Sequence, residues 1–540
     1  MFKFFHLESK TIISAAVMVG VFSCVSRLMG FIRDRILAGA FGAGDVLDAY
    51  YAAFKIPDFM FSLLVVGSLS ASFIPLFCKH YHHPLGRKKA WSFSNNFLHV
   101  VVFFVGGVSL LLAVFAPFFS SVIAPGFSFE KQELVMIFFR IMLLAQVLLA
   151  CSMVFGSALQ SLKRFALYAL APVFYNLGIM IGALWFVDWW GPVGLAWGVV
   201  FGAALHLVVQ VVGVYGAGYR YEWIFHPRDR DTQEVVRLTG PRMLGIAMQQ
   251  IMFVFFTMIA SGLAVGSVSI FQFAYNIEYF PVGIIGISYA IAAFPTFTEL
   301  LEGKRIEAFV ETFVNVVRQL LFLLVPMTIF FLVLRAQIVR LVVGAGAFDW
   351  EATILTADTL AFFALTFIPQ SLVYVLARAF FGLHDTVTPM TAGIVSVVIG
   401  LVSAFWLTSI FGVIGLGMAF SIASIIQVVL LWIPLRQRLG TLGESKMISA
   451  LFKTTIAGLV CALVTQLLKP VAVQLFSLDT FLGVFFQGCF AGGIGLASYL
   501  FVSFLLRSEE LQALIMGIQK KFLRAYKPSE SVPLDGGIST

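Results

Sequence analysis

Apolar segments long enough to cross a membrane recur along the whole chain, separated by short polar loops. A helix needs about 20 apolar residues to span the hydrocarbon core of a bilayer, and by that rule we count about fourteen segments. They lie near residues 11–40, 45–78, 91–119, 133–160, 166–188, 192–217, 238–262, 267–297, 309–334, 354–382, 387–409, 412–435, 447–468 and 480–506. The pattern predicts an all-α polytopic membrane protein.

Composition supports this class. Of the 540 residues, 60% are hydrophobic and 11% are charged, whereas a soluble domain carries about 25% charged residues. The net charge of +8 is spread over short loops rather than gathered in one basic domain, which argues against a nucleic-acid partner. The five cysteines stand singly in apolar stretches, a pattern that indicates free thiols rather than a disulfide framework or a metal site.

Lysine and arginine set the expected orientation, because cytoplasmic loops are enriched in both residues. Alternate loops are rich in these cations, namely residues 79–89, 163–164, 220–237, 304–305 and 436–446. The opposite loops hold few, among them Lys131, Arg335 and Lys469. An even number of spans then places both termini in the cytoplasm and predicts a basic cytoplasmic tail over residues 507–540.

The chain also resembles itself at a spacing of about 220 residues, as internal repeats do. The stretch "ILAGAFGAGDVLDAYYAAFKIP" (36–57) parallels "IASGLAVGSVSIFQFAYNIEYFP" (259–281), and residues 171–198 parallel 388–419. The repeat predicts two pseudo-symmetric six-helix lobes around a central cavity, related by an axis along the membrane normal. We assign residues 1–219 to the first lobe, 220–440 to the second and 441–506 to two additional helices.

Charges within the spans distinguish the two halves. The first half carries Arg27, Arg33, Asp34, Asp48 and Lys55. The aligned positions of the second half are neutral; Gln249 stands opposite Arg27, so we expect these two side chains to face one another across the cavity. A charge deep in a bilayer costs from about 3 to more than 10 kcal/mol unless it meets water or a partner. These side chains are therefore expected to line a polar cavity.

The two arginines favour a phosphate ligand, because a guanidinium offers paired donors to phosphate oxygens. Asp48 and Lys55 are seven residues apart and share one helical stripe, and Arg27 and Asp34 have the same spacing. The alternative is that Arg27 and Arg33 extend to the membrane interface and pair with Asp34 or Asp48. For Arg35 we expect such an interfacial position.

The stretch "SRLMGFIRDRILAGAFGAGDVLDAYYAAFKIPDF" (26–59) resembles the opening of the MviN/MurJ lipid II flippases, which belong to the multidrug/oligosaccharidyl-lipid/polysaccharide exporter superfamily. "LKRFALYALAPVFYN" (162–176), "FPVGIIG" (280–286) and "LHDTVTP" (383–389) are similar to that family in the same order. The resemblance implies two six-helix lobes and two further helices that form a groove for a lipid tail.

The resemblance also implies that Arg27, Arg33 and Asp48, with Asp34 beside them, belong to a cationic cavity. Three family arginines are replaced here, by Phe61, Ser62 and Asn276. The cavity is therefore expected to be less cationic than the family pattern. The candidate substrate-binding residues are Arg27, Arg33, Asp34, Asp48, Lys55, Gln249 and Asn276.

The expected function is transport rather than catalysis. The protein would flip a polyprenyl-diphosphate-linked peptidoglycan precursor from the cytoplasmic to the outer leaflet of a bacterial cytoplasmic membrane by alternating access. One alternative is a flippase for another lipid-linked glycan. A second is a drug/ion antiporter of the same fold, for which Asp48 is the candidate titrating carboxylate. A third is a membrane scaffold for cell-wall synthesis.

No cofactor is expected, and the sequence leaves open whether a monovalent cation or the membrane potential drives transport. Asp385 is a weak candidate metal ligand, but its place in "GLHDTVTP" more simply predicts a helix cap. The expected partners are the lipid-linked disaccharide-peptide, membrane lipids and, as an open choice, enzymes of cell-wall synthesis.

Overall fold

The computed structural model describes residues 12–63, 69–82, 86–478 and 480–526. Within these ranges the chain forms helices joined by turns and contains no strand. The first half comprises α1 (Ile12–Phe41), α2 (Asp45–Phe61), α3 (Leu69–Tyr81), α4 (Gly86–Val114), α5 (Ala116–Ile123), α6 (Phe129–Ser161), α7 (Phe165–Ile181), η3 (Gly182–Phe186), α8 (Val187–Trp190) and α9 (Val193–Tyr215).

The second half repeats this order. It comprises α10 (Arg230–Ser261), α11 (Ser267–Pro281), η4 (Val282–Gly286), α12 (Ile287–Glu302), α13 (Ile306–Val333), α14 (Arg335–Val342), α15 (Trp350–Ala364), α16 (Phe367–Gly382), α17 (Val387–Phe411) and α18 (Ile414–Leu439). Each half begins with one long helix, continues with two shorter helices, and then has a long helix followed by a short one. The arrangement agrees with the repeat read from the sequence.

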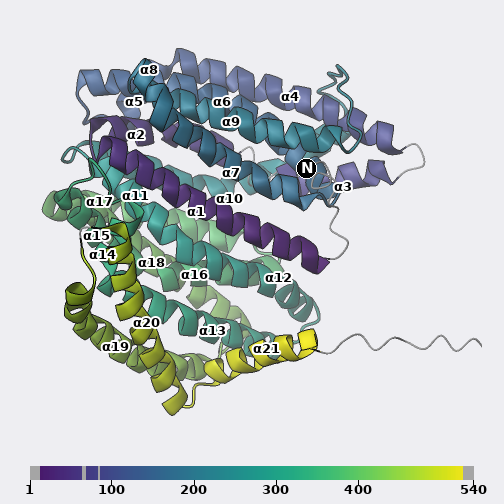
Figure 1. The fold of residues 1–540 in the computed structure, drawn as a ribbon. Helices are drawn as coiled ribbons and strands as arrows, with labels where there is room; N and C mark the ends of the chain where they lie inside the picture. The colour runs from purple at the N-terminus through teal and green to yellow at the C-terminus, as the bar shows by residue number, and fades with distance from the viewer. Residues whose placement is uncertain (1–11, 64–68, 83–85, 479, 527–540) are drawn as a thin grey trace, which may run out of the picture.

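The two halves stack side by side as lobes, and the remaining helices lie against the second lobe (Figure 1). These are α19 (Glu444–Leu475), α20 (Phe481–Leu505) and α21 (Glu509–Tyr526). The predicted tail therefore begins as a helix, while its residues 527–540 lie outside the described part of the chain. In α21, Glu509 and Glu510 pair with Arg318 of α13 at 2.8 and 2.6 Å, so this helix is fastened to the second lobe.

The described helices identify a polytopic membrane protein. Ten of them are long and apolar enough to cross a bilayer, and the α15–α16 pair, bent by 42°, counts as an eleventh if it forms one span. The other expected spans fall on α1, on α2 with α3, and on α10, which carry charged residues. The predicted number of about fourteen spans therefore remains approximate.

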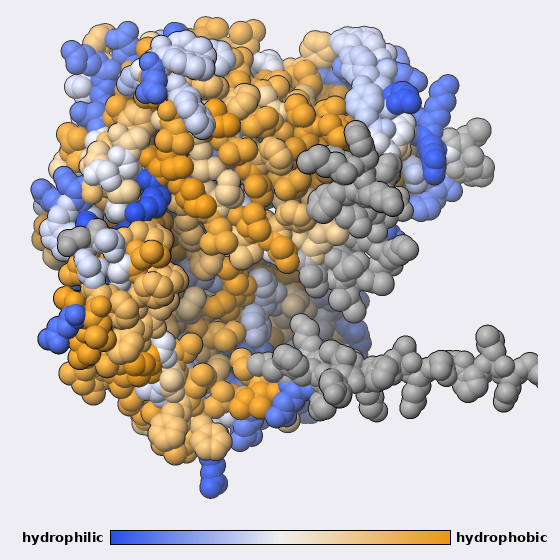
Figure 2. All heavy atoms as spheres, viewed as in Figure 1, coloured by the Kyte–Doolittle hydropathy of each residue, from blue (hydrophilic) through white to orange (hydrophobic). Residues whose placement is uncertain are grey.

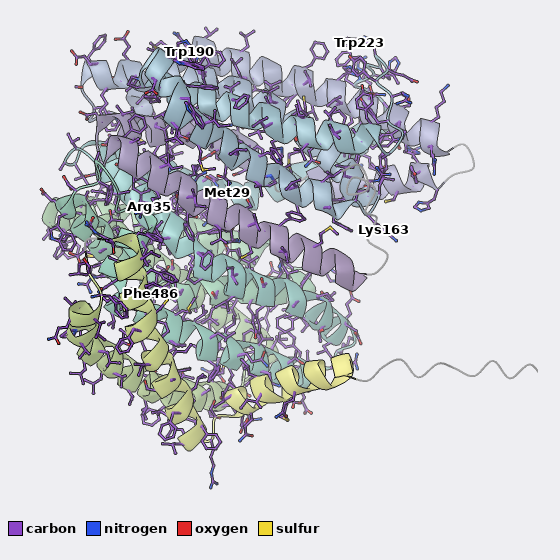
Figure 3. The ribbon with its side chains drawn as sticks, viewed as in Figure 1. Met29, Arg35, Lys163, Trp190, Trp223 and Phe486 are labelled. Atoms are coloured by element: carbon purple, nitrogen blue, oxygen red, sulfur yellow. The ribbon has the colours of Figure 1, made fainter. Side chains whose placement is uncertain are left out.

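The outer surface suits a bilayer. Apolar side chains cover much of the face shown in Figure 2. Trp190 and Trp223 are 53% and 66% exposed and lie at opposite ends of the first lobe (Figure 3). Tryptophan is enriched at both membrane–water interfaces. The helices between these two residues are thus placed to cross the hydrocarbon region.

Candidate transport site between the lobes

A cavity of about 250 Å³ lies where the first helix of the first lobe meets the second lobe. Its lining comes from α1 and from α11. The lining residues are Arg27, Gly30, Phe31, Arg33, Asp34, Tyr275, Asn276, Tyr279 and Phe280. Both lobes therefore build the cavity, as a site used during relative movement of two lobes requires.

Arg33 is held in a fixed orientation within this cavity. Its Nε and one terminal nitrogen donate to Asp34 Oδ1 at 3.0 and 2.8 Å, and the other donates to Asn176 Oδ1 at 3.0 Å. The Asp34 side chain is only 2% exposed. A buried carboxylate needs such a partner because an unpaired charge is costly in a dry environment.

The hydrogen bonds continue from Asp34 across the boundary between the lobes. Asn276 Nδ2 donates to Asp34 Oδ2 at 2.9 Å, and Gln272 Nε2 donates to Asn276 Oδ1 at 2.8 Å. Lys55 Nζ then donates to Gln272 Oε1 at 2.6 Å. A continuous polar chain thus links α7, α1, α11 and α2, with two amide side chains on the side of the second lobe.

Arg27 is placed differently from Arg33. Its guanidinium carbon lies 5.5 Å from the centre of the Tyr279 ring, in a cation–π contact. A Cβ atom built at Gly283 would be 2.7 Å from the Arg27 guanidinium, so glycine at that position makes room for it. Among the described residues, no carboxylate forms an ion pair with Arg27. Its donors therefore remain available to an anionic ligand.

Four of the predicted site residues, Arg27, Arg33, Asp34 and Asn276, line one cavity together. Lys55 joins them only through Gln272.

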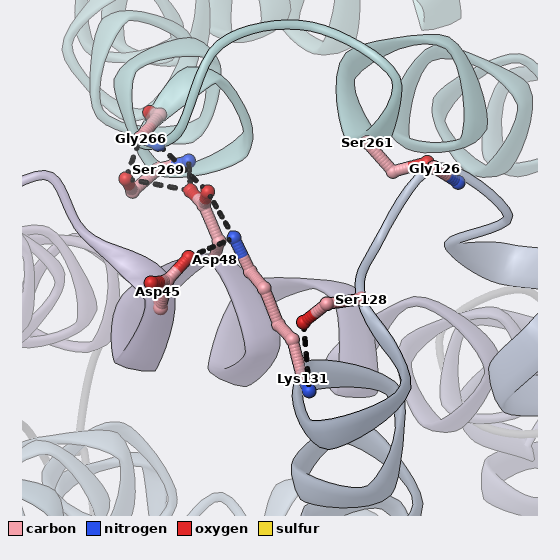
Figure 4. Close-up of polar contacts among 8 residues, drawn as sticks. All are labelled: Asp45, Asp48, Gly126, Ser128, Lys131, Ser261, Gly266 and Ser269. Atoms are coloured by element: carbon pink, nitrogen blue, oxygen red, sulfur yellow. Dashed lines mark hydrogen bonds and ion pairs between the residues drawn. The ribbon is translucent and has the colours of Figure 1, made fainter.

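Asp48 lies elsewhere, in a cluster between the ends of the lobes (Figure 4). Its carboxylate accepts hydrogen bonds from Lys131 Nζ at 2.9 Å, from Gly266 N at 2.8 Å, and from both Ser269 N and Ser269 Oγ at 2.9 Å. Asp48 and Lys55 share one helical stripe, as predicted, but they do not pair with each other. Seven residues of helix place the two side chains on one stripe but separate them by about 10 Å along the axis. Asp48 instead caps the first turn of α11 from the opposite lobe.

Backbone contacts hold the lobes together around Asp48. Ala347 N donates to Gly39 O at 2.9 Å, and Gly126 N donates to Ser261 Oγ at 3.1 Å. Gly266 has φ +89°, and a Cβ atom there would lie 2.4 Å from the Ala43 carbonyl oxygen. Only glycine meets both conditions without strain. We call this set of contacts the interlobe clamp.

Gln249 does not face Arg27, contrary to the alignment of the halves. It lines a separate cavity of about 80 Å³ inside the second lobe, together with Met252, Gln370 and Ser424. The repeat identifies equivalent positions in two lobes, and equivalence does not bring two side chains to the same cavity.

Asp385 caps α17, as its sequence context predicts. Its Oδ1 accepts from Val387 N and Thr388 N at 2.9 Å each, and Arg438 lies 2.7 Å from Oδ2. Partial burial opposes ionisation, but the hydrogen bonds from Thr388 and the charge of Arg438 together lower the pKa of Asp385. No group of three or more His, Cys, Asp or Glu residues is suited to hold a metal ion in the described part of the chain.

Arg35 is not simply interfacial. One of its terminal nitrogens donates to the carbonyl oxygens of Arg340 and Leu341 at 3.1 and 2.9 Å, and its guanidinium lies 4.8 Å from the Phe481 ring centre. Figure 3 shows it at the end of α1 near α14 and α20. Arg35 thus ties the first lobe to the second lobe and to an additional helix.

Several functional candidates were missed in the sequence. Asn176, Gln272 and Lys131 are uncharged or lie outside the conspicuous motif, but Gln272 stands one turn from Asn276, a spacing that could have suggested the pair. Asp58 follows Lys55 by three residues; it is exposed and interacts electrostatically with Lys55 and Arg33.

A second, larger cavity of about 730 Å³ lies between α13–α15 of the second lobe and α19. Apolar residues such as Leu332, Ile354 and Leu463 line it. Two cationic side chains lie at it: Arg335 pairs with Asp358 at 3.2 Å, and Lys469 donates to the Val333 carbonyl at 3.0 Å. The cavity is mainly apolar with a polar edge, as an amphipathic lipid requires.

Two helical lobes joined at one end, with a charged cavity between them inside the membrane, define an alternating-access transporter. The sequence model described as lipid II flippase MurJ matches residues 37–486. The chain therefore belongs to the MurJ lipid II flippase family.

Individual relatives support the same family membership. A probable lipid II flippase MurJ of Buchnera aphidicola subsp. Acyrthosiphon pisum is 26% identical over 500 residues, covering 91% of this chain and 96% of the relative. One of Rhizobium meliloti is 30% identical over 429 residues, covering 77% and 79%.

Solved structures share the fold. A lipid II flippase MurJ in an inward closed conformation superposes with a TM-score of 0.73 at 20% identity, covering 91% of this chain and 99% of that one. An inward-facing multidrug resistance transporter of the MATE family gives 0.65 at 14% identity, covering 79% and 99%.

Proposed function

We propose that this protein flips lipid II, a polyprenyl-diphosphate-linked peptidoglycan precursor, from the cytoplasmic to the outer leaflet of a bacterial inner membrane. Membership of the MurJ family supports the substrate. The observation that carries the mechanism is Arg27, a cation without an ion-pair partner among the described residues, in a cavity built by both lobes. The charged headgroup would cross in this cavity.

The two arginines have different roles in this proposal. Arg27 contacts the diphosphate directly, since its donors are not engaged by a carboxylate. Arg33 contributes positive charge while Asp34 and Asn176 hold its position. A guanidinium can donate two parallel hydrogen bonds to phosphate oxygens, which a lysine cannot.

The interlobe clamp would close the outer end during loading. The excess of Lys and Arg in alternate loops supports a cytoplasmic position for both termini, for the segment between α3 and α4 and for the start of α21. The α1–α2 loop, which includes Ala43, then lies outside. Outward opening requires Asp48 to leave Gly266 and Ser269, so the clamp is the part that must break and re-form in each cycle.

The polyprenyl tail would remain in lipid. The 730 Å³ cavity beside α19 offers apolar walls for a chain and cationic side chains near a headgroup. We extend the proposal to membrane lipids as neighbours and to cell-wall synthesis enzymes as partners, because a flipped precursor must be polymerised outside.

Asp48 no longer supports the antiporter alternative, since its carboxylate already accepts hydrogen bonds from four donors.

The experiment is rescue of a bacterial strain depleted of its own lipid II flippase. Expression of this chain should restore growth and return lipid II to the outer leaflet, measured by its accessibility to an externally added enzyme that cleaves it. Normal accumulation of the protein without either effect would contradict the proposal.

A further inference from the structure

Glu278 is a buried carboxyl group in the second lobe that the proposed transport site does not use. It lies on α11, between the cavity residues Asn276 and Tyr279, and is 2% exposed. An ionisable side chain inside a membrane-spanning segment is a functional candidate because its charge is costly there. No described residue of α2, α10, α15 or α18, which pack near α11, forms an ion pair with Glu278.

The surroundings of Glu278 are polar but uncharged. The titratable groups that interact with it are Tyr275 and Tyr279 on the same helix and Tyr374 on α16. The cation Arg27 lies beyond them, over the ring of Tyr279. Glu278 is thus next to the transport site, and no cation among the described residues pairs with it to stabilise its ionised form.

The hydrogen bonds around Thr366 indicate which form of Glu278 this conformation holds. Thr366 Oγ1 lies 2.8 Å from Glu278 Oε1 and 2.6 Å from the Phe363 carbonyl oxygen. A hydroxyl has one proton, so it cannot donate fully to both acceptors. If Glu278 carries a proton, it donates to Thr366, and Thr366 donates to Phe363. Every contact is then satisfied.

We propose that Glu278 is a proton-binding site that couples the proton gradient to movement of the lobes. Thr366 occupies the break between α15 and α16, where the two helices bend by 42°. Protonated Glu278 fits this bend, whereas the ionised form would leave a buried charge with at most one donor. Loss of the proton therefore favours another arrangement of the α15–α16 pair against α11.

The direction of coupling follows from this preference and rests on the proposed function. Protonation favours the conformation in which the interlobe clamp is formed. Proton binding from outside would therefore favour the return to this conformation after lipid II has been released. Proton release to the cytoplasm would accompany the next outward step, so proton entry and precursor export are opposed movements.

The test uses the full chain reconstituted in vesicles that contain lipid II, with the membrane potential clamped by potassium and an ionophore. A pH gradient is imposed, and the appearance of lipid II at the opposite face is measured. One proton per cycle permits at most about a tenfold bias for each pH unit. Wild type should respond to the gradient, and Glu278→Gln should flip without responding. Glu302→Gln, an exposed glutamate at the end of α12, is the matched control and should respond as wild type does.

Thr366→Val provides a second measurement if Glu278→Gln fails to accumulate. Removal of the hydroxyl should shift the pH midpoint of flipping without abolishing it. An unchanged midpoint, or an unaltered gradient response in Glu278→Gln, overturns the inference. A wild-type protein that flips lipid II without responding to the gradient also overturns it and leaves the proposed function intact. Absence of any flipping by wild type instead overturns the proposed function.

Discussion

At the scale of residues, the site combines one uncommitted cation with one that is already paired. Arg27 makes a cation–π contact with Tyr279, whereas Arg33 donates hydrogen bonds to Asp34 and Asn176. Asn276 occupies a position where the family resemblance implies an arginine, yet it still contacts Asp34 at 2.9 Å. The contact between the lobes is thus kept while positive charge is lost. The remaining arginines should be correspondingly sensitive to substitution.

Arg27→Ala should abolish rescue of the depleted strain while the protein still accumulates. A hydrogen bond to a charged group contributes about 1.5–3 kcal/mol, so diphosphate binding should weaken about tenfold to a hundredfold or more. Arg33→Ala should also abolish rescue, and it should lower thermal stability as well because buried Asp34 loses its partner. Arg33→Lys should restore function only partly, since it loses the paired donors. Diphosphate binding and the melting temperature are measured for each of these variants in parallel with rescue.

Arg305→Ala is the control for these substitutions, since Arg305 is 56% exposed and its ion-pair partner, Glu299, is exposed as well. Normal growth of both Arg27→Ala and Arg33→Ala at normal protein levels would show that the arginines are structural.

At the scale of elements, a helix of one lobe is capped by a side chain of the other. Asp48 accepts hydrogen bonds from the backbone amides at the start of α11 and also pairs with Lys131 of α6, whose side chain is 8% exposed. Carboxylates stabilise helix N-termini because the first amides lack partners. The closed arrangement therefore depends on one buried ion pair between α2 and α6 and on its contact with α11.

Asp48→Ala should destabilise the protein by about 3 kcal/mol, because it leaves buried Lys131 with only the exposed Asp45 as a partner and removes the acceptor for the first amides of α11. Lys131→Met combined with Asp48→Ala should lower the free energy of unfolding by less than the sum of the two single changes. Thermal unfolding in detergent of wild type, both single variants and the double variant measures this double-mutant cycle. Asp45→Ala is the matched control: Asp45 also contacts Lys131, at 2.7 Å, but is 63% exposed, and its loss should cost less than about 1 kcal/mol. Strict additivity of the Asp48 and Lys131 changes would show that their ion pair does not support the clamp.

Attachment of α21 should depend on pH. Burial opposes ionisation of Glu510, but the hydrogen bond from Ser508 and the charge of Arg318 lower its pKa below the ordinary carboxyl value. A lowered pKa means that the stabilisation is present above the ordinary carboxyl pKa and is lost as pH falls through the lowered value. A spin label at Gln512→Cys should be immobile at neutral pH and mobile in acid.

Arg318→Ala should make this label mobile at every pH. A label that stays immobile in Arg318→Ala would show that other contacts hold α21.

Much of the fold could be predicted from the sequence because spans and repeats depend on local composition. Arg27, Arg33 and Asp34 could also be predicted as site residues, because a charged side chain within a membrane span is energetically costly and therefore conspicuous in the sequence. Asp48 and Gln249 were misplaced because their positions depend on which helices meet across the lobes. Glu278 could not be singled out from the sequence, since its significance comes from Thr366, which lies 88 residues away along the chain.

At the scale of the whole molecule, orientation is the property on which the direction of transport depends. Lys88→Cys should resist an impermeant thiol reagent added to intact cells and react after permeabilisation, in a background without the five native cysteines. Lys88 is exposed at the start of α4, whereas Gly86, two residues earlier, is buried and a Cβ there would lie 2.4 Å from the Tyr81 carbonyl oxygen. Labelling of Lys88→Cys in intact cells would show that the protein has the opposite orientation in the membrane.

The glycine contacts of the interlobe clamp also bear on leakage. At Gly39, Gly126 and Gly266 the two lobes approach so closely that even an added Cβ atom would meet the opposite lobe within 3.3 Å. Such spacing leaves no room for a file of water molecules along which ions could pass. A cavity open to one side of the membrane can therefore fill with water without letting ions cross to the other side. A larger residue at any of these glycines should separate the lobes there and let ions leak across the membrane.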